Sequence, residues 1–298
     1  MDDPQVYLSV AGKEEILPLS QARIPVLDRG FIFGDGIYEV VPVYQSVPFR
    51  LAQHLARLDR SLAAIGLANP FDTDGWKSRI ATLIAKYPAP EQIIYMQVTR
   101  GVAKRAHAFP RDAVPTVFIM PGVLSLPTPE VRRAGVAVVT ARDNRWLRCD
   151  IKSTSLLGNV LMAQNAAEAG VAETVMFRDG NLTEGSSSNV WIVKGGVLKA
   201  PPKNERILEG IRYGFIAELA ATHGVPLEIG AVSEAEVREA DEIMLSSASK
   251  EVLAVVRIDE KTVGAGVPGP VYAQFYGWYQ IAKSASQKAA RSGEREVA

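Results

Sequence analysis

Two side chains in this sequence, a lysine and a glutamate, are suited to chemistry on a single aldehyde cofactor. Lys152 closes the segment 145–152, and Glu184 follows within the glycine- and serine-rich segment 182–189. A lysine amine can form an imine with an aldehyde. A carboxylate can pair with a protonated pyridine nitrogen, which keeps the ring able to accept electrons from a carbanion. Pyridoxal phosphate needs both groups, so the pair predicts this cofactor.

Each of the two residues also has a simpler explanation. Lys152 alone would be a solvated surface lysine, because a lysine with its ordinary pKa is protonated at neutral pH and is a poor nucleophile. Arg145 and Arg148 lie close in sequence, and we expect their positive charge to lower the pKa of Lys152. Glu184 alone would be a helix-capping or loop glutamate in a turn-like segment. The combination of the two residues is what favours the cofactor.

A phosphate site is expected at the start of a predicted helix over 211–223. Gly210 precedes this helix, and free backbone N–H groups at a helix N-terminus bind phosphate. Ser247 and its neighbours follow a predicted strand and offer hydroxyl and amide groups. Arg57 shares a helix face with His54, and its guanidinium can contact phosphate through two nitrogens. Each of these features is common on its own.

A second group of residues could bind a substrate carboxylate. Arg105 and His107 are two positions apart, so in an extended loop their side chains point to the same side. Tyr38 and Val40 share one face of a predicted strand in the same way. A solvated loop is the alternative explanation for Arg105 and His107.

The elements that must position these residues are strands and helices in two domains. We expect an N-terminal domain over 1–121, an interdomain linker over 122–129, a C-terminal domain over 130–285 and a frayed tail over 286–298. The linker is predicted because the prolines between 121 and 129 are incompatible with a helix or a central strand. The predicted strands are 5–10, 36–44, 92–99, 115–120, 136–140, 174–178, 189–194, 242–246 and 252–258. One predicted helix carries the apolar positions 55, 58, 62 and 65 and ends at 66, and a second begins after 72 or 73. Three more predicted helices cover 156–169, 211–223 and 271–284. The fold class is α+β, with mixed sheets and flanking helices.

Composition excludes several classes of function. The 298 residues carry 33 basic and 33 acidic side chains, so no net charge favours nucleic acid or an anionic membrane. Cys149 is the single cysteine, which rules out a disulfide within the chain and a cysteine-based zinc cluster. The three histidines have no metal-binding spacing, and we expect no metal. The acidic start and the lack of a long apolar run predict a soluble cytoplasmic protein.

Taken together, these segments resemble the fold-type IV pyridoxal-phosphate enzymes, the class IV aminotransferases. The resemblance runs from about Asp28 to Ser249. The segments that carry it are 28–31, 33–41, 97–101, 105–107, 145–152 and 183–190. The resemblance implies a two-domain α+β fold like that of the D-amino acid aminotransferases, a homodimer, and a site between the two domains.

The resemblance also implies a role for each matching residue. Lys152 would bind the cofactor aldehyde and move the proton at the substrate Cα, and Glu184 would pair with the ring nitrogen. Leu208 would pack beneath the ring. The residues that would hold the phosphate, partly through their backbone, are Arg57, Ile211, Arg212, Ser247 and Ala248. The residues that would bind substrate are Tyr38, Val40, Arg105 and His107, with the last two arriving from the second subunit.

Three positions qualify this resemblance. The family usually has threonine where this chain has Arg212 and often a hydroxyl where it has Ala248, so phosphate binding would depend more on backbone amides and arginine. Branched-chain enzymes usually carry a tyrosine where this chain has Leu157, which favours the D-amino acid subgroup. The expected reaction is ping-pong transamination of D-amino acids, with D-alanine and 2-oxoglutarate giving pyruvate and D-glutamate. A 4-amino-4-deoxychorismate lyase and a branched-chain or (R)-amine transaminase are alternatives on the same scaffold, and a non-catalytic binding module is disfavoured.

Overall fold

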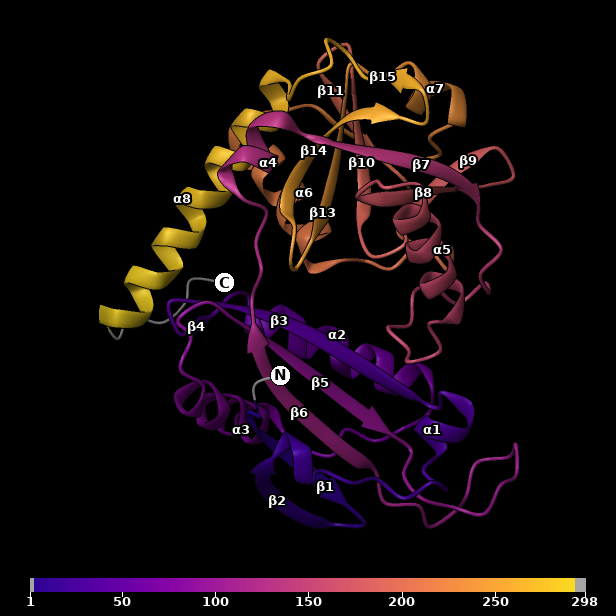
Figure 1. Cartoon of the computed structure of the whole chain (residues 1–298), viewed down its shortest axis with the longest axis vertical. Helices are drawn as coiled ribbons and strands as arrows, with labels where there is room; N and C mark the ends of the chain where they lie inside the picture. The colour runs from indigo at the N-terminus through magenta and orange to yellow at the C-terminus, as the bar shows by residue number, and fades with distance from the viewer. Residues whose placement is uncertain (1–2, 293–298) are drawn as a thin grey trace. The chain divides into compact units, whose positions relative to one another are not determined.

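The computed structural model describes residues 3–292, which divide into two compact units (Figure 1). The first unit contains 3–125, Ile151–Ser155 and 289–292, and the second contains Leu126–Asp150 and 156–288. The chain leaves the first unit at Ser125, inside the segment predicted as a linker. It then returns to the first unit for the short segment that carries Lys152.

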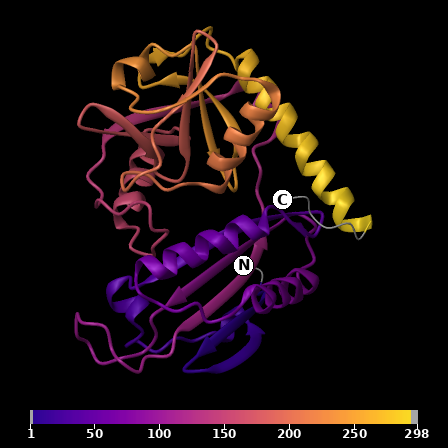
Figure 2. The same ribbon diagram turned by 180° about the vertical axis from the view of Figure 1, so that it is seen from behind.

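The first unit is built on an antiparallel sheet of six strands in the order β2-β1-β6-β5-β3-β4. Its strands are β1 Gln5–Val10, β2 Lys13–Pro18, β3 Gly36–Tyr44, β4 Val47–Pro48, β5 Gln92–Thr99 and β6 Thr116–Val123. Its helices are the 3-10 turn Leu19–Gln21, α1 Arg29–Phe33, α2 Leu51–Ala64 and α3 Thr73–Lys86. Leu58 of α2 and Trp76 of α3 belong to the same core cluster as Ile94 of β5, so both long helices cover one face of the sheet (Figures 1 and 2).

Strand β3 separates core residues from candidate site residues by its alternation. Side chains alternate between the two faces of a strand. Ile37, Glu39 and Val41 are fully buried on the helix-covered face, whereas Tyr38 and Val40 are only half-buried on the other face. The sequence therefore presents two predicted substrate residues on the face that the helices leave uncovered.

Pro121 corrects one prediction about the linker. It lies inside β6, opposite Ile94 of β5, although the sequence reasoning excluded proline from a central strand. The other neighbour of β6, strand β1, pairs with it only at residues 117–119. Beyond that point one side of β6 has no partner strand, so the N–H that proline lacks costs no ladder hydrogen bond.

The second unit contains the mixed sheet, of nine strands in the order β12-β11-β10-β13-β14-β7-β8-β9, with β15 paired to β14. Its strands are β7 Val136–Arg142, β8 Glu173–Arg178, β9 Asn181–Gly185, β10 Asn189–Lys194, β11 Val197–Ala200, β12 Leu227–Ile229, β13 Glu242–Ser247, β14 Glu251–Ile258 and β15 Lys261–Thr262. Its helices are α4 Pro129–Ala134, α5 Leu157–Glu168, α6 Ile211–His223, α7 Glu234–Arg238 and α8 Pro270–Ser292. Strand β7 pairs in parallel with both β14 and β8. The predicted α+β class is confirmed.

Two further predictions about the second unit differ from the structure. Glu184 lies in strand β9 rather than in a turn, because the turn at Asp179 and Gly180 joins β8 to β9 directly. Helix α8 continues to Ser292 instead of ending at 284. The remainder of the predicted tail, 293–298, lies outside the described residues. Within 3–292, no helix is both long enough and apolar enough to cross a membrane.

Candidate active site

Lys152 is fixed in the first unit through its own backbone. Its N–H donates to the hydroxyl of Ser61 on α2 (3.3 Å), and its carbonyl accepts from the N–H of Tyr38 on β3 (2.9 Å). The amine lies 4.1 Å from the centroid of the Tyr38 ring, over its face. The structure gives Lys152 no ion pair with a carboxylate among the described residues of this unit. A half-buried amine beside an aromatic ring and without an acidic partner is a suitable imine-forming group.

Arg57 is part of a buried charge cluster on the opposite face of β3. The carboxylate of Glu39 accepts from Arg57 Nε (2.7 Å) and a terminal Arg57 nitrogen (2.9 Å), and it lies 2.8 Å from His54 Nδ1. Burial alone would raise the pKa of Glu39, but Arg57 and His54 hold it well below its usual range. The predicted shared face of His54 and Arg57 is therefore used to bind Glu39. The role of Arg57 at a phosphate stays a prediction.

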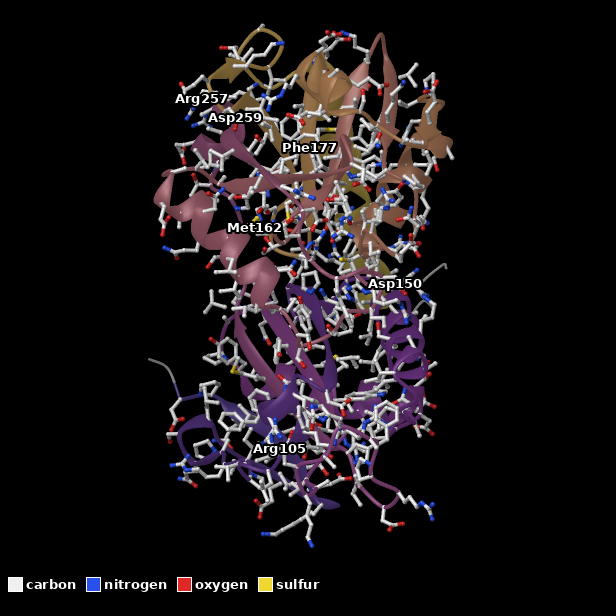
Figure 3. All side chains as sticks on the ribbon, turned by 90° about the vertical axis from the view of Figure 1, so that its right-hand side faces the viewer. Arg105, Asp150, Met162, Phe177, Arg257 and Asp259 are labelled. Carbon is white, nitrogen blue, oxygen red and sulfur yellow. The ribbon has the colours of Figure 1, made fainter. Side chains whose placement is uncertain are left out.

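Arg105 and His107 lie on the irregular loop that joins β5 to β6, where Figure 3 labels Arg105. Both side chains are exposed. They share one neighbour, Phe33 of α1, whose ring centroid lies 5.3 Å from Arg105 Cζ and 5.5 Å from the His107 ring. Within the described chain, neither forms a hydrogen bond or ring contact with Tyr38.

In the second unit, Glu184 is a buried carboxylate with three donors. One oxygen accepts from Arg145 (2.6 Å), and the other accepts from the N–H of Leu208 (3.1 Å) and from the side chain of Asn189 (3.3 Å). Burial raises the pKa of Glu184 to about 7, against the lowering effect of Arg145. A protonated ring nitrogen placed at this carboxyl would favour its ionised form. The site therefore suits the pyridinium of pyridoxal phosphate.

Asn189 also links Glu184 to the predicted phosphate site. Its side chain donates to the carbonyl of Leu208 (2.8 Å). A Cβ on Gly210 would collide with the side-chain oxygen of Asn189, so a larger residue at this position would have to displace the Asn189 side chain from Glu184 and Leu208. Gly210 gives helix α6 no side-chain cap, which leaves the first amides of the helix, starting at Ile211, available for an anion.

Trp191 connects helix α6 to the end of β13, where the other predicted phosphate ligands lie. Its ring lies 4.5 Å from Tyr213 of α6, and its N–H donates to the hydroxyl of Ser246 (3.0 Å). Ser247 and Ala248 come next in the chain, at the end of β13. The side chain of Arg212 is buried and donates to the hydroxyl of Tyr279 on α8 (3.1 Å). Arg212 can thus contribute its backbone amide while its guanidinium supports helix packing.

The serine run after Glu184 has a function that the sequence did not show. The hydroxyls of Ser186, Ser187 and Ser188 all donate to Glu173, a fully buried carboxylate of β8. Lys250 pairs with the same carboxylate (3.1 Å), and its N–H donates to the hydroxyl of Ser247 (3.1 Å). The cluster therefore connects the segment after Glu184 to the loop that carries two predicted phosphate ligands.

The two arginines that precede Lys152 in the sequence have carboxylate partners that sequence reasoning did not identify. Arg145 pairs with Glu184 and with Asp143 (2.9 Å), and Arg148 pairs with Asp150 (3.2 Å). Carboxylates therefore balance both charges that were expected to lower the pKa of Lys152. The position of Arg145 in a segment matching the family was the signal that could have marked it as a site residue.

The first unit thus carries a half-buried lysine beside an aromatic ring, and the second carries a buried carboxylate and a helix start without a side-chain cap. These are the groups that the sequence predicts to bind pyridoxal phosphate. Residues 36–258 match the family amino-transferase class IV, and the chain belongs to this family. Among curated proteins, it is 39% identical over 256 residues to a D-alanine aminotransferase of Bacillus licheniformis, a match that covers 86% of this chain and 90% of the relative. A D-alanine aminotransferase of Listeria innocua is 36% identical over 91% of this chain and 95% of its own length.

Solved structures share the fold. A branched-chain amino acid aminotransferase of Escherichia coli has a TM-score of 0.86 over 94% of this chain and 94% of its own, at 22% sequence identity. One from the archaeon Thermoproteus uzoniensis, solved with norvaline, has a TM-score of 0.85 over 94% of this chain and 95% of its own, at 23% identity. Another branched-chain enzyme that matches at a TM-score of 0.87 was solved with pyridoxamine 5'-phosphate. Because these identities are low, the likeness supports the predicted fold type IV and not the substrate.

Proposed function

We propose that this protein is a pyridoxal-phosphate-dependent aminotransferase of D-amino acids that converts D-alanine and 2-oxoglutarate into pyruvate and D-glutamate. The observation that carries the proposal is the buried carboxylate of Glu184, held by Arg145, Asn189 and the Leu208 amide. Even with Arg145 beside it, burial raises the pKa of this carboxyl to about 7, so a second cation, such as a protonated ring nitrogen, would favour its ionised form. The similarity to proteins named D-alanine aminotransferase supports the choice of substrate.

The chain's own residues supply binding and proton transfer. Bound pyridoxal phosphate supplies an electron sink for the substrate carbanion. Glu184 keeps the ring nitrogen protonated, and the first amides of α6 with Ser247 and Arg57 bind the phosphate. Lys152, as a neutral amine, would move the proton from the substrate Cα to C4′ of the cofactor in the first half-reaction and in the opposite direction in the second, a step that typically contributes about 10²–10⁴-fold.

Substrate orientation is assigned to the remaining predicted residues. Tyr38 and the loop with Arg105 and His107 bind the α-carboxylate by charge-assisted hydrogen bonds. Val40 lines the side-chain pocket. We propose a homodimer in which this loop is supplied by the second subunit, and a cytoplasmic location. Light scattering of the purified protein and cell fractionation test these two points.

Branched-chain transamination is the second candidate, because branched-chain enzymes are structural neighbours. The residue that argues against it is Leu157, at the position where the branched-chain enzymes usually carry a tyrosine. An (R)-amine substrate would leave Arg105 and His107 without a carboxylate to bind.

The deciding experiment is the visible spectrum of the purified protein with pyridoxal phosphate, before and after D-alanine or L-leucine. Loss of the yellow band with D-alanine, together with pyruvate formation from 2-oxoglutarate, supports the proposal. A band that responds only to L-leucine moves the function to the branched-chain group. A protein that never becomes yellow refutes the roles of Lys152 and Glu184.

A further inference from the structure

The loop that carries Arg105 and His107 is held from behind by Arg29, the first residue of α1. The guanidinium of Arg29 is buried and donates to the backbone carbonyls of Ala106 (2.6 Å), His107 (3.2 Å) and Ala108 (3.4 Å). Three consecutive carbonyls thus converge on one side chain. These residues lie in no helix or strand, so no backbone ladder fixes their conformation.

Asp35 holds Arg29 in place and joins it to a second arginine. One Asp35 oxygen accepts from Arg29 Nε (2.7 Å) and from Arg100 Nε (2.9 Å). Burial alone would raise the pKa of Asp35, but the two arginines keep it below its usual value, so the carboxylate is charged at neutral pH. Because Asp35 fixes both guanidinium planes, Arg29 presents its remaining N–H groups in one direction.

Arg100 anchors the far end of the loop. It donates to the carbonyls of Ile65 (2.7 Å) and Gly66 (3.3 Å), which follow α2. Its Cζ lies 3.5 Å from the centroid of the Phe109 ring, a cation–π contact. The near end is tied by a hydrogen bond from the N–H of Arg29 to the carbonyl of Gly101 (2.9 Å). The loop is therefore fixed at both ends and at its centre.

The ring of Phe33 sets the direction of the two exposed side chains. Its centroid lies 4.9 Å from Arg29 Cζ, 5.3 Å from Arg105 Cζ and 5.5 Å from the centroid of the His107 ring. The hydrogen bonds from Arg29 fix the backbone of the loop, and the contact with Phe33 limits the rotamers of Arg105 and His107. The Arg105 guanidinium and the His107 imidazole thus both contact the same ring.

We propose that Arg29 is a positioning residue that determines how tightly the enzyme binds the α-carboxylate of its substrates. This inference rests on the proposed function, in which Arg105 and His107 bind that carboxylate. A loop released from Arg29 still carries both groups, but it must be ordered each time substrate binds, which weakens binding of every carboxylate substrate. Proton transfer at Lys152 and binding of the cofactor do not involve this loop.

The test is Arg29→Lys, which keeps the charge beside Asp35 but cannot donate to three carbonyls through a rigid fork. We expect KM for D-alanine, pyruvate and 2-oxoglutarate to rise together by about tenfold or more, with kcat, the cofactor Kd and the visible spectrum unchanged. Arg79→Lys is the matched control, because Arg79 pairs with Glu14 (2.7 Å) and lies over Phe71 in the same unit, away from the loop.

A second readout does not depend on activity. Trypsin cleaves after Lys104 and Arg105, which are exposed in the loop. We expect faster cleavage at these two bonds in the Arg29→Lys homodimer than in the wild-type or Arg79→Lys protein, as identified by mass spectrometry. Unchanged cleavage together with unchanged KM overturns the proposal.

Arg105→Gln separates this proposal from the function on which it rests. If Arg105→Gln raises KM for the three substrates and Arg29→Lys does not, Arg29 has no positioning role and the proposed function stands. If Arg105→Gln also leaves every KM unchanged, the carboxylate site is assigned to the wrong residues. A loss of cofactor binding in Arg29→Lys identifies a general structural role and overturns the proposal as well.

Discussion

Replacing Glu39 by glutamine tests whether its carboxylate balances the positive charge of Arg57 in the buried cluster under β3. Glu39 is fully buried and accepts two hydrogen bonds from Arg57, itself buried. Glutamine keeps the shape, but it removes the negative charge and turns an NH2 group toward a guanidinium that can only donate. Removing one partner of a buried ion pair costs about 3–5 kcal/mol, because the other charge stays buried. We expect Glu39→Gln to lower the free energy of unfolding by that amount.

The assay is equilibrium unfolding in urea, followed by circular dichroism and fluorescence. Trp76 is the tryptophan of the first unit and is fully buried in its core, so its emission reports this unit. A lower midpoint with an unchanged slope identifies a change of stability. The double variant Glu39→Gln/Arg57→Met should be less destabilised than the sum of the single variants, because it leaves no unpaired charge. A loss under about 1 kcal/mol, or strict additivity, refutes the buried-pair argument.

For Glu39→Gln, the change in stability relative to wild type should also depend on pH and on the presence of the cofactor. The pKa of Glu39 is lowered on folding from 4.5. Its contribution is therefore fully present above about pH 4.5 and is lost as the pH falls toward the folded pKa, so wild type and variant should converge in acid. If Arg57 also binds the cofactor phosphate, pyridoxal phosphate should stabilise Glu39→Gln more than wild type, because the dianion replaces the lost charge.

Three further variants test the remaining site residues. Lys152→Ala should lose at least about 10²–10⁴-fold in kcat and should not change the unfolding midpoint of the apoprotein, as measured by stopped-flow kinetics and urea titration. The pKa of Glu184 is raised on folding from 4.5 to about 7, so the apoprotein should lose up to about 3 kcal/mol of stability as the pH rises from about 4.5 to 7. Glu184→Gln should abolish that loss, and an unchanged pH profile contradicts the assignment. Lys250→Met leaves the charge of Glu173 buried without its cation, and it should raise the cofactor Kd in a fluorescence titration; an unchanged Kd removes the link between this cluster and the phosphate loop.

The elements with strong periodicity could be predicted from sequence alone. The strands 36–44 and 92–99 and the helix 211–223 have the predicted bounds. Their apolar spacing is dictated by which face is buried, and that information is local. Helix α1 was missed because its five residues are too few to show a period. Its existence depends on Asp28, whose side chain accepts from the N–H of Gly30 and caps the helix.

The misassigned strand β9 shows where composition misleads. Its neighbourhood is rich in glycine, serine and threonine, which usually indicates a turn. Here Ser186 and Ser188 are buried and their hydroxyls donate to Glu173. Gly185 is also buried, and a Cβ at this position would collide with the Ser188 hydroxyl. The contact with Glu173 is tertiary, so a local pattern could not contain it. The partners of Glu184 could not be predicted for the same reason, because Arg145 is distant in sequence and is brought to Glu184 by the tertiary structure.

Arg212 shows how an apparent departure from the family can have a structural role. In the sequence, an arginine in place of a threonine at a phosphate site suggests a new ligand. The guanidinium instead donates to Tyr279 of α8, and the ring of Tyr279 packs edge-on against Phe215 of α6. The Nε group of this arginine is therefore used in the packing between two helices. The backbone amides at the uncapped start of α6, which are predicted to bind the phosphate together with Ser247 and Arg57, depend on Gly210 and not on the residue type at 212.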